Sequence, residues 1–411
     1  MTTQSSLRIL PYSLLLLLSA LCLNPASAQN RLNLYGYFAT RYEKVFDEPR
    51  LVNGEIVRQD APGEWSNPFL NVMVQHQLSE KFQVFLNLNG AGKGAVEVRN
   101  FWGEYAMAPF LRVRLGRMYR KFGLYNELLD AVPTYYGIEP PELFDRDHLI
   151  VSRTSTLMVY GTFDVGAGLF DYSLTTDNGE GGASNNALPI GWDLKYRKGL
   201  TYTVGFSGYT SGGKTTSDVG IGEGSPRTGV LPWMNSDDFS VIGAYGEANL
   251  GSLTLQGAYW FSRHDAERDP ESVLAVIEGA DVNEAQLRRF LHDAHASLDV
   301  ANVNTDGDYV VRTWYLRAGY SVITDAGELA PYLQWDWYSN PETIQSKLWG
   351  GDNEAGLADD GRFHKATLGI VFRPIPNVAI KLDGSSHIFK YKGETIQFPE
   401  IRFDVSYVFG Q

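Results

Sequence analysis

The chain ends in Phe398–Gln411, which reads FPEIRFDVSYVFGQ. Every second residue from Ile401 to Phe409 is apolar, whereas Arg402, Asp404 and Ser406 occupy the other parity. Because successive side chains of a strand point to opposite faces, this pattern predicts a strand with one apolar and one polar face. Such a strand fits a soluble sheet over a core, and it also fits the closing strand of a transmembrane barrel.

The opposite end of the chain, residues 1–28, has the features of a secretory signal peptide. Arg8 precedes an apolar run, and a small-residue Ala-Ser-Ala ending predicts cleavage after Ala28. Cys22 is the single cysteine, and the bulky Leu21 before it argues against a lipoprotein signal. An exported chain without cysteine has no disulfide framework.

Residues 29–411 are expected to form one domain, and their composition restricts its class. The net charge of −13 argues against nucleic acid as a partner. Beyond the signal peptide there is no apolar run of about 18 residues, so a membrane could be crossed only by a closed barrel.

Alternating segments of about ten residues recur along residues 29–411, separated by turn residues. We count about sixteen, with fourteen to eighteen possible, and the connections alternate between long and short as in bacterial barrels. The predicted fold class is therefore all-β, a transmembrane antiparallel up-and-down β-barrel.

Two long segments interrupt this rhythm. Residues 123–152 combine prolines, aromatic residues and carboxylates, so we expect a stiff loop that folds into the barrel and narrows it, or one packed outside. Residues 264–306 contain a predicted loop helix, capped at Asp281–Asn283 and running to Leu298. Four carboxylates of the first segment are candidates for the constriction: Glu127, Asp130, Glu139 and Glu142.

Strand parity predicts which charged residues face the lumen. A Lys or Arg facing lipid costs about 2–4 kcal/mol at mid-membrane, so consistently polar parity indicates a wet interior. Glu104 and Arg117 break the parity and predict a bulge, and Arg312 falls on the lipid side where it could meet a head group. The predicted lumen bases are Arg112, Arg114, Lys195, Arg197, Arg317, Lys365, Arg373, Lys381 and Arg402, and the predicted lumen acids are Asp336, Asp383 and Asp404.

Three neighbouring stretches, Glu104-Tyr105, Leu111–Arg117 and Phe122–Glu127, resemble the porins of the phosphate-selective family. The shared features are a strand-turn-strand ending in Gly-Arg and a Phe-Gly-Leu stretch. The resemblance implies a sixteen-stranded, homotrimeric porin that takes up anions. The sequence departs from the family at Lys121, where proline is usual, and it lacks a dense lysine series, so phosphate as the solute is not implied.

Catalytic and metal-binding signals are weak. His292 and His295 flank Asp293 without an evident third ligand, and Asn302–Asp308 imitates a calcium loop without the closing glutamate. No catalytic triad can be drawn from the scattered histidines. We therefore predict no catalytic residue, metal or cofactor, with a membrane-embedded hydrolase as the alternative.

The resulting hypothesis is a porin of the Gram-negative outer membrane, through which small hydrophilic solutes or ions diffuse passively. Its expected partners are outer-membrane lipid, lipopolysaccharide and the outer-membrane assembly machinery. Two alternatives are a plugged barrel whose external loops bind a partner or a surface, and a soluble secreted β-protein.

Overall fold

The computed structural model describes residues 32–66, 68–91, 94, 96–128, 136–142, 153–178, 187–224, 226 and 229–410. The predicted signal peptide, residues 1–28, and the last residue, Gln411, lie outside these ranges. Within the described residues no helix is long and apolar enough to span a membrane.

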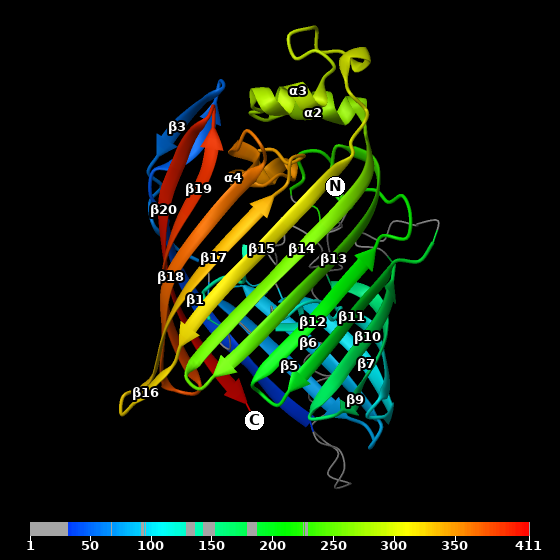
Figure 1. Cartoon of the computed structure of the whole chain (residues 1–411), viewed down its shortest axis with the longest axis vertical. Helices are drawn as coiled ribbons and strands as arrows, with labels where there is room; N and C mark the ends of the chain where they lie inside the picture. Colours follow the sequence, from blue (N-terminus) through cyan, green and yellow to red (C-terminus); the bar gives the residue numbers. More distant parts are fainter. Residues whose placement is uncertain are drawn as a thin grey trace, which may run out of the picture.

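Sixteen long antiparallel strands form a closed barrel with up-and-down order, which confirms the predicted fold class (Figure 1). Each long strand pairs with its neighbour along the chain, and β1 closes the barrel by pairing with β20. The strands are β1 (Leu32–Val45), β5 (Phe69–Gln77), β6 (Phe82–Ala91), β7 (Val96–Ala108), β8 (Leu111–Tyr119), β9 (Arg153–Val165), β10 (Gly168–Asp177), β11 (Ile190–Lys198), β12 (Tyr202–Thr210), β13 (Met234–Leu250), β14 (Leu253–Arg268), β15 (Tyr309–Tyr320), β17 (Gly327–Ser339), β18 (Arg362–Ile375), β19 (Val378–Tyr391) and β20 (Glu394–Gly410).

Four short strands add to this barrel. β4 (Glu64–Trp65) and β16 (Val322–Thr324) extend its sheet, whereas β2 (Glu48–Val52) and β3 (Glu55–Gln59) form a separate hairpin. This hairpin lies in the connection between β1 and β5. The hairpin turns at Asn53-Gly54, where both residues have positive φ, as a tight hairpin turn requires.

The two faces of the wall differ as the closing strand predicts. In β20, Ile401 and Tyr407 are exposed on the outer side, while Asp404 and Ser406 are buried on the inner side. β15 repeats the pattern, with Leu316 outside and Arg317 inside. Apolar side chains therefore face outward, and polar side chains face the lumen.

The predicted bulge is present in β7. Asn87 pairs with Asn100 and Leu88 pairs with Val98, so Arg99 is the extra residue of β7 at this point. The extra residue reverses the parity of the rest of β7, so Glu104 points inward and is buried. Arg117 remains outward, since it pairs with the exposed Phe101.

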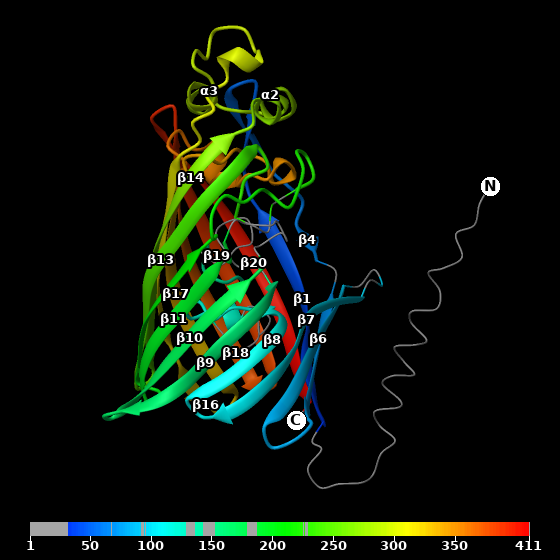
Figure 2. The same cartoon turned by 90° about the vertical axis from the view of Figure 1, so that its right-hand side faces the viewer.

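The barrel wall is uneven in height (Figures 1 and 2). β5, β8, β11 and β12 have 9 residues each, whereas β13 and β20 have 17 and β14 has 16. The shortest strands belong to the run from β5 to β12 on one side of the barrel, which we call the short wall. The longest strands belong to the run from β13 to β20 on the other side, which we call the tall wall.

Helices cover the barrel mouth beside the tall wall. They are α2 (Pro270–Gly279), α3 (Glu284–Phe290) and α4 (Asn353–Leu357), accompanied by the 3₁₀ turns η4 (Val300–Asn302) and η5 (Lys347–Trp349). A further 3₁₀ turn, η1 (Asn126–Leu128), follows β8 and directly follows Tyr125, which bonds Gln256 of β14 inside the barrel. The prediction of one helix from Asp281 to Leu298 is wrong in its extent.

Local signals explain the two helices of this segment. Asn283 caps α3 as predicted and forms a reciprocal capping box with Gln286. The chain leaves the helix at Leu291, which forms a bridge to Val303. Helix α2 starts at Asp269-Pro270, a side-chain cap followed by a proline that already has a helical φ.

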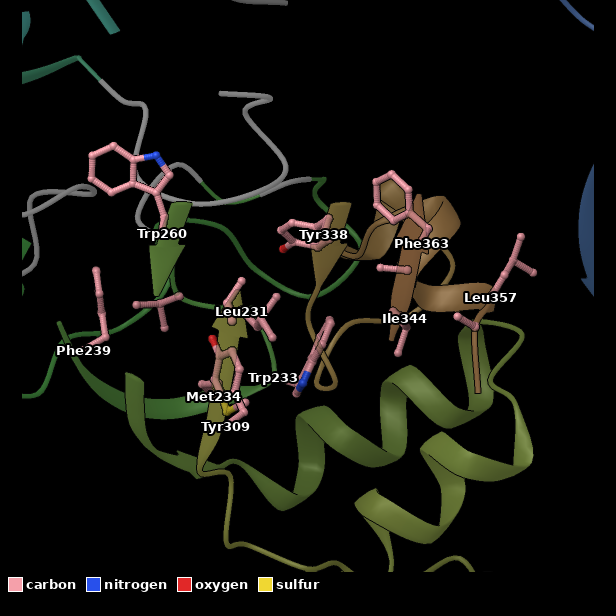
Figure 3. Packing of buried hydrophobic residues seen from close by; sticks show 14 of the residues in the cluster. Leu231, Trp233, Met234, Phe239, Trp260, Tyr309, Tyr338, Ile344, Leu357 and Phe363 are labelled. Atoms are coloured by element: carbon pink, nitrogen blue, oxygen red, sulfur yellow. The ribbon is translucent and has the colours of Figure 1, made fainter. Parts of the chain in front are cut away.

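A buried apolar cluster joins these helices to the strand ends (Figure 3). Trp233, from the connection between β12 and β13, lies edge-on to Phe290 of α3 at 6.1 Å between ring centroids. Ile344 and Leu357, from the connection between β17 and β18, belong to the same cluster. Several connections thus pack together over the mouth.

Candidate functional site

Residues 123–128 and 136–142 of the predicted constriction loop are described. The second part, Tyr136–Glu142, lies inside the barrel against the wall formed by β1, β17, β18, β19 and β20. We call it the inner segment. Side chains from the strands hold its backbone: Lys381 Nζ donates to the Gly137 carbonyl at 2.7 Å, Ile138 N donates to Asp383 Oδ2 at 2.9 Å, and Glu142 N donates to Asp336 Oδ1 at 3.2 Å.

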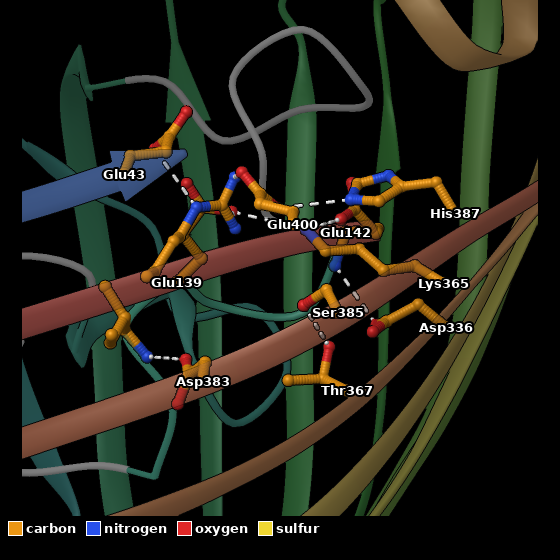
Figure 4. A network of polar contacts seen from close by, with 12 residues as sticks. Glu43, Glu139, Glu142, Asp336, Lys365, Thr367, Asp383, Ser385, His387 and Glu400 are labelled. Carbon is orange, nitrogen blue, oxygen red and sulfur yellow. Dashed lines mark hydrogen bonds and ion pairs between the residues drawn. The ribbon is translucent and has the colours of Figure 1, made fainter. Parts of the chain in front are cut away.

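Two glutamates of the inner segment contact three bases of the wall, and Figure 4 shows both glutamates near Lys365. Glu139 forms ion pairs with Arg402, with Arg41 at 3.4 Å and with Lys365 at 3.3 Å. Glu142 accepts a hydrogen bond from Lys365 at 2.5 Å. We call these five residues the loop anchor.

The charge of Glu139 is strongly stabilised in this setting. Burial alone would raise the pKa of its carboxyl, but the positive charges of Arg402, Lys365 and Arg41 outweigh burial and hold the pKa well below its usual range. Glu139 is therefore an anion throughout the neutral and mildly acidic range.

The anchor continues toward the barrel mouth. Arg402 also contacts Glu400 at 2.6 Å and Glu43 at 3.1 Å. His387 lies between Glu400 at 3.1 Å and Glu354 of α4 at 3.0 Å. Burial would raise the pKa of Glu354, but the contact with His387 lowers it well below its usual range. This chain of contacts connects the inner segment to the cap.

A second charged surface lines the opposite side of the lumen, on β8, β10 and β11. Arg112 lies 3.6 Å from Glu104, and Arg197 lies 2.5 Å from Asp171. The side chains of the two arginines are 42% and 39% exposed, whereas those of Glu104 and Asp171 are 1% and 15% exposed. The positive groups therefore meet the lumen, and their carboxylates lie beneath them.

Other charges support this surface. Arg114 donates to Glu104 at 2.8 Å, and Lys121 donates to Glu127 at 3.0 Å. Burial would raise the pKa of Glu127, but Lys121, Arg114 and Lys195 lower it. We call Arg112, Arg114, Lys195 and Arg197 the basic wall.

The remaining predicted lumen residues lie on the inner face but differ in environment. Arg373 pairs with Glu328 at 3.1 Å near the short turns. Asp130 lies outside the described residues. The others are buried against the inner segment or against each other: Arg317, Asp336, Lys381, Asp383 and Asp404.

Several residues of the site were not predicted. Arg41 has the same inward parity as Tyr37 and Ala39, so strand periodicity could have found it. Glu104 was set aside because the bulge that turns it inward could not be placed from sequence. His387 and Glu400 have the same inward parity as Asp383 and Arg402 on their strands, so strand periodicity could have found them as well.

Outside the anchor, a serine, a histidine and an aspartate form a hydrogen-bonded arrangement with the geometry of a triad. The expectation that no triad could be drawn is therefore wrong for the positions of the side chains. Ser262 Oγ lies 2.8 Å from His264 Nε2, and His264 Nδ1 lies 2.7 Å from Asp237 Oδ2. All three side chains are buried, and the imidazole stacks between Phe239 and Tyr309. The enclosed hydroxyl suits a structural hydrogen bond at the top of the tall wall. In the described part of the chain no group of three potential metal ligands is present.

No protein-family model and no curated protein sequence matches this chain. Solved structures match its fold. They include an anion-selective porin from Comamonas acidovorans, with a TM-score of 0.57 and 15% identity over 92% of this chain and 100% of that chain. The outer-membrane channel DcaP of Acinetobacter baumannii has a TM-score of 0.53 and 8% identity over 93% and 99%. The trimer form of OmpT, an outer membrane protein of Vibrio cholerae, has a TM-score of 0.52 and 10% identity over 92% and 99%.

Proposed function

We propose that the protein is a porin of the Gram-negative outer membrane, which lets small hydrophilic solutes or ions diffuse passively. The observation that carries this proposal is a closed barrel with an apolar outer face, a charged inner face and a chain segment held inside it. Sixteen strands enclose more space than their own side chains fill. The fold likeness to solved porins supports the same conclusion.

The solute path in this proposal runs between the inner segment and the basic wall. The bases of the anchor are paired with carboxylates, because Glu139 and Glu142 contact Arg41, Lys365 and Arg402, and Arg402 also contacts Glu43 and Glu400. The opposite side exposes Arg112 and Arg197, together with the Glu127 carboxylate, whose side chain is 37% exposed. Charged rings of this kind select ions by sign.

We further propose that the pore prefers anions, because Arg112 and Arg197 are exposed to the lumen while their carboxylate partners, Glu104 and Asp171, are covered. The likeness to an anion-selective porin agrees with this sign. Phosphate is not proposed as the solute, because the basic wall has four members and each is close to a carboxylate or belongs to a mixed cluster.

We propose a homotrimer joined through the short wall, with the short turns facing the periplasm and the cap facing outside. Phe101, Leu115 and Leu157 are exposed there, and with Arg117 they border a hollow of about 350 Å³. A trimer-forming barrel of the same fold supports this assembly. Export through a cleaved signal peptide and insertion by the assembly machinery belong to the same proposal.

A plugged barrel is the second candidate, and one observation favours it. Inward residues that would meet water in a wide pore, such as Lys381, Asp404 and Ser406, are fully buried. The inner segment and the cap thus fill much of the lumen on the side of the tall wall. In this reading the cap would be the binding surface.

Swelling of liposomes that contain the purified protein separates the two candidates. A porin gives rapid swelling with small sugars and slower swelling as the sugar grows, because its narrow passage excludes by size. A plugged barrel gives the rate of protein-free liposomes for every sugar. Heat-modifiable mobility on gels would show that the protein tested is folded.

A further inference from the structure

Three aromatic side chains line the lumen beside the basic wall. Phe85 of β6 pairs with Trp102 of β7, and their rings lie nearly parallel, with centroids 5.0 Å apart and an interplanar angle of 16°. Trp102 has the same inward parity as Glu104. Tyr160 of β9 likewise shares the parity of the buried Met158. All three rings thus point inward, and each is half-buried. We call Phe85, Trp102 and Tyr160 the aromatic shelf.

Cationic side chains join the rings of the shelf. The Arg114 guanidinium lies over the Trp102 ring, 3.8 Å from its centroid, and 5.1 Å from the centroid of the Tyr160 ring. Lys121 Nζ lies over the Tyr160 ring at 4.9 Å and pairs with Glu127 at 3.0 Å. Because a positive charge is attracted to the face of an aromatic ring, these contacts hold the rings and cations together across β6, β7, β8 and β9.

Glu104 holds the shelf from beneath. Its carboxylate accepts hydrogen bonds from Gln83 at 2.8 Å and from Arg114 at 2.8 Å, and it accepts another from the Tyr160 hydroxyl. The Glu104 side chain is 1% exposed. A buried carboxylate that satisfies several donors fixes their positions. Arg114 and Tyr160 are therefore positioned before any solute arrives, which lowers the entropic cost of binding one.

Arg112 presents an available guanidinium next to the shelf. It pairs with Tyr160 across the sheet, and its side chain is 42% exposed, compared with 15% for Arg114. Its distance of 3.6 Å from Glu104 is longer than a charge-assisted hydrogen bond. The Arg112 guanidinium can therefore turn its donors toward a carboxylate in the lumen.

Aromatic rings on the opposite side of the lumen are covered. Trp260 of β14 and Tyr315 of β15 are buried. Phe122, from the connection after β8, stacks on Trp260 at 4.3 Å between ring centroids, and Tyr125 lies edge-on to Tyr315 at 5.9 Å. The aromatic shelf, by contrast, borders the passage between the inner segment and the basic wall, where a solute can reach it.

We infer that the aromatic shelf and Arg112 form a binding site for solutes that combine a carboxylate with a flat aromatic ring. The inference rests on the proposed porin function and deepens it by naming a solute class. The solute carboxylate binds Arg112, whose planar guanidinium can donate two parallel hydrogen bonds to it. The solute ring packs against Trp102 and Tyr160. Because ring contacts add to the attraction of charge, the site favours aromatic carboxylates over aliphatic carboxylates of the same charge.

Block of the chloride current through single wild-type channels tests the solute class. Benzoate and cyclohexanecarboxylate have the same charge and nearly the same size, so a difference between them reports the flat aromatic ring. We expect half-maximal block at about two- to tenfold lower concentration of benzoate. Equal block by the two anions, or weaker block by benzoate, would overturn the inference.

Benzamide tests the part that Arg112 plays, since it has the same ring as benzoate and no charge. We expect benzamide to need at least about tenfold higher concentration for the same block, because a neutral amide lacks the charge-assisted contact. Equal block by benzamide and benzoate would remove Arg112 from the site.

The variants W102L and W102F test the location. W102L removes the ring and should abolish the advantage of benzoate over cyclohexanecarboxylate, whereas W102F keeps a ring and should retain most of it. The matched control is W335L, which removes an exposed tryptophan from the outer face of β17 and should behave as the wild type. An unchanged advantage in W102L, or equal loss in W335L, would contradict the assignment to the shelf. Heat-modifiable mobility shows that each variant is folded, and the comparison of anions on the wild type stands without any variant.

Saturation-transfer NMR keeps this inference separate from the porin proposal. It detects benzoate bound to the wild-type protein in detergent whether or not the protein conducts. We expect transfer from the protein to the ring protons of benzoate, and severalfold less transfer with W102L than with W335L. Equal transfer with the two variants would overturn the site even in a protein that conducts chloride. Transfer that W102L reduces, in a protein that carries no current, would reject the porin and leave the binding site standing.

Discussion

Arg112 and Arg197 of the basic wall are exposed to the lumen, and their carboxylate partners lie beneath them. A unit charge about 4 Å from a passing ion contributes about 1 kcal/mol in water, or about fivefold in local concentration. Two such groups can therefore determine which sign of ion enters more readily.

The double variant R112Q/R197Q is expected to lose most of the anion preference. The reversal potential in a salt gradient should move toward the value for a cation-selective pore. The ratio of anion to cation permeability should fall severalfold. The exposed Lys198→Gln, at a short turn, serves as the control and should behave as the wild type. An unchanged reversal potential in the double variant would show that the solute path avoids the basic wall.

Glu139 gives a prediction about pH. Its folded-state pKa lies well below the usual range, so the stability from its ion pairs is present above the unfolded pKa of about 4.3 and is lost as pH falls toward the folded pKa. Because Glu139 stays ionised in this range, single-channel conductance should not change between about pH 7 and 5.

Glu139→Gln removes the anchor charge at every pH. It leaves Arg402, Lys365 and Arg41 short of one carboxylate, which costs about 1–3 kcal/mol of local stability. We expect larger and noisier single-channel currents at pH 7, because the inner segment is held less firmly. The exposed Glu284→Gln in α3 is the control. Currents identical to the wild type in E139Q would show that Glu139 does not position the segment.

At the scale of elements, the closing strand meets β1 at a glycine. Gly410 has a φ of +92° and pairs with Tyr35, and a Cβ built on it would lie 2.1 Å from the Leu34 carbonyl oxygen. A side chain there strains the seam that closes the barrel, at a cost of about 1–3 kcal/mol.

Gly410→Ala is expected to lower the yield of heat-modifiable barrel during refolding, because it distorts the end of the β1–β20 pairing. Gly384→Ala on β19 is the matched control, since its new Cβ would have no contact nearer than 4.0 Å. Equal yields for both variants would mean that the seam tolerates a side chain.

Local chemistry explains which elements could be predicted. The parity of β20 and the cap at Asn283 follow from short patterns, and both predictions are confirmed. The β2–β3 hairpin carried an Asn-Gly signal that was overlooked among polar neighbours. Helix α3 ends early because Leu291 pairs with Val303, a contact between distant residues that periodicity cannot reveal.

At the scale of the whole molecule, the even strand number and closed order followed from repeated alternation and from the need to satisfy every backbone group in lipid. The sign of each inward charge could be predicted, but not its exposure. Lys381 and Arg112 have the same parity, yet one is buried under the inner segment and the other meets the lumen. Only the three-dimensional path of that segment distinguishes them.

The uneven wall predicts how subunits meet. The sequence has one cysteine, Cys22 in the predicted signal peptide, so a new thiol would be unique in the processed chain. Leu115→Cys on the short wall should yield crosslinked products with a short bis-maleimide, whereas Leu316→Cys on the tall wall should not, although both positions are exposed. The molar mass from light scattering should be that of a trimer. Crosslinking through position 316 alone would place the contact on the opposite side.

The central claim is a water-filled passage between the inner segment and the basic wall of a closed barrel. Single-channel recording of the purified wild-type protein in a planar bilayer tests it most directly. We predict stable, ohmic current steps whose reversal potential in a potassium chloride gradient indicates anion preference. Folded, heat-modifiable protein that inserts into the bilayer and carries no current would contradict it.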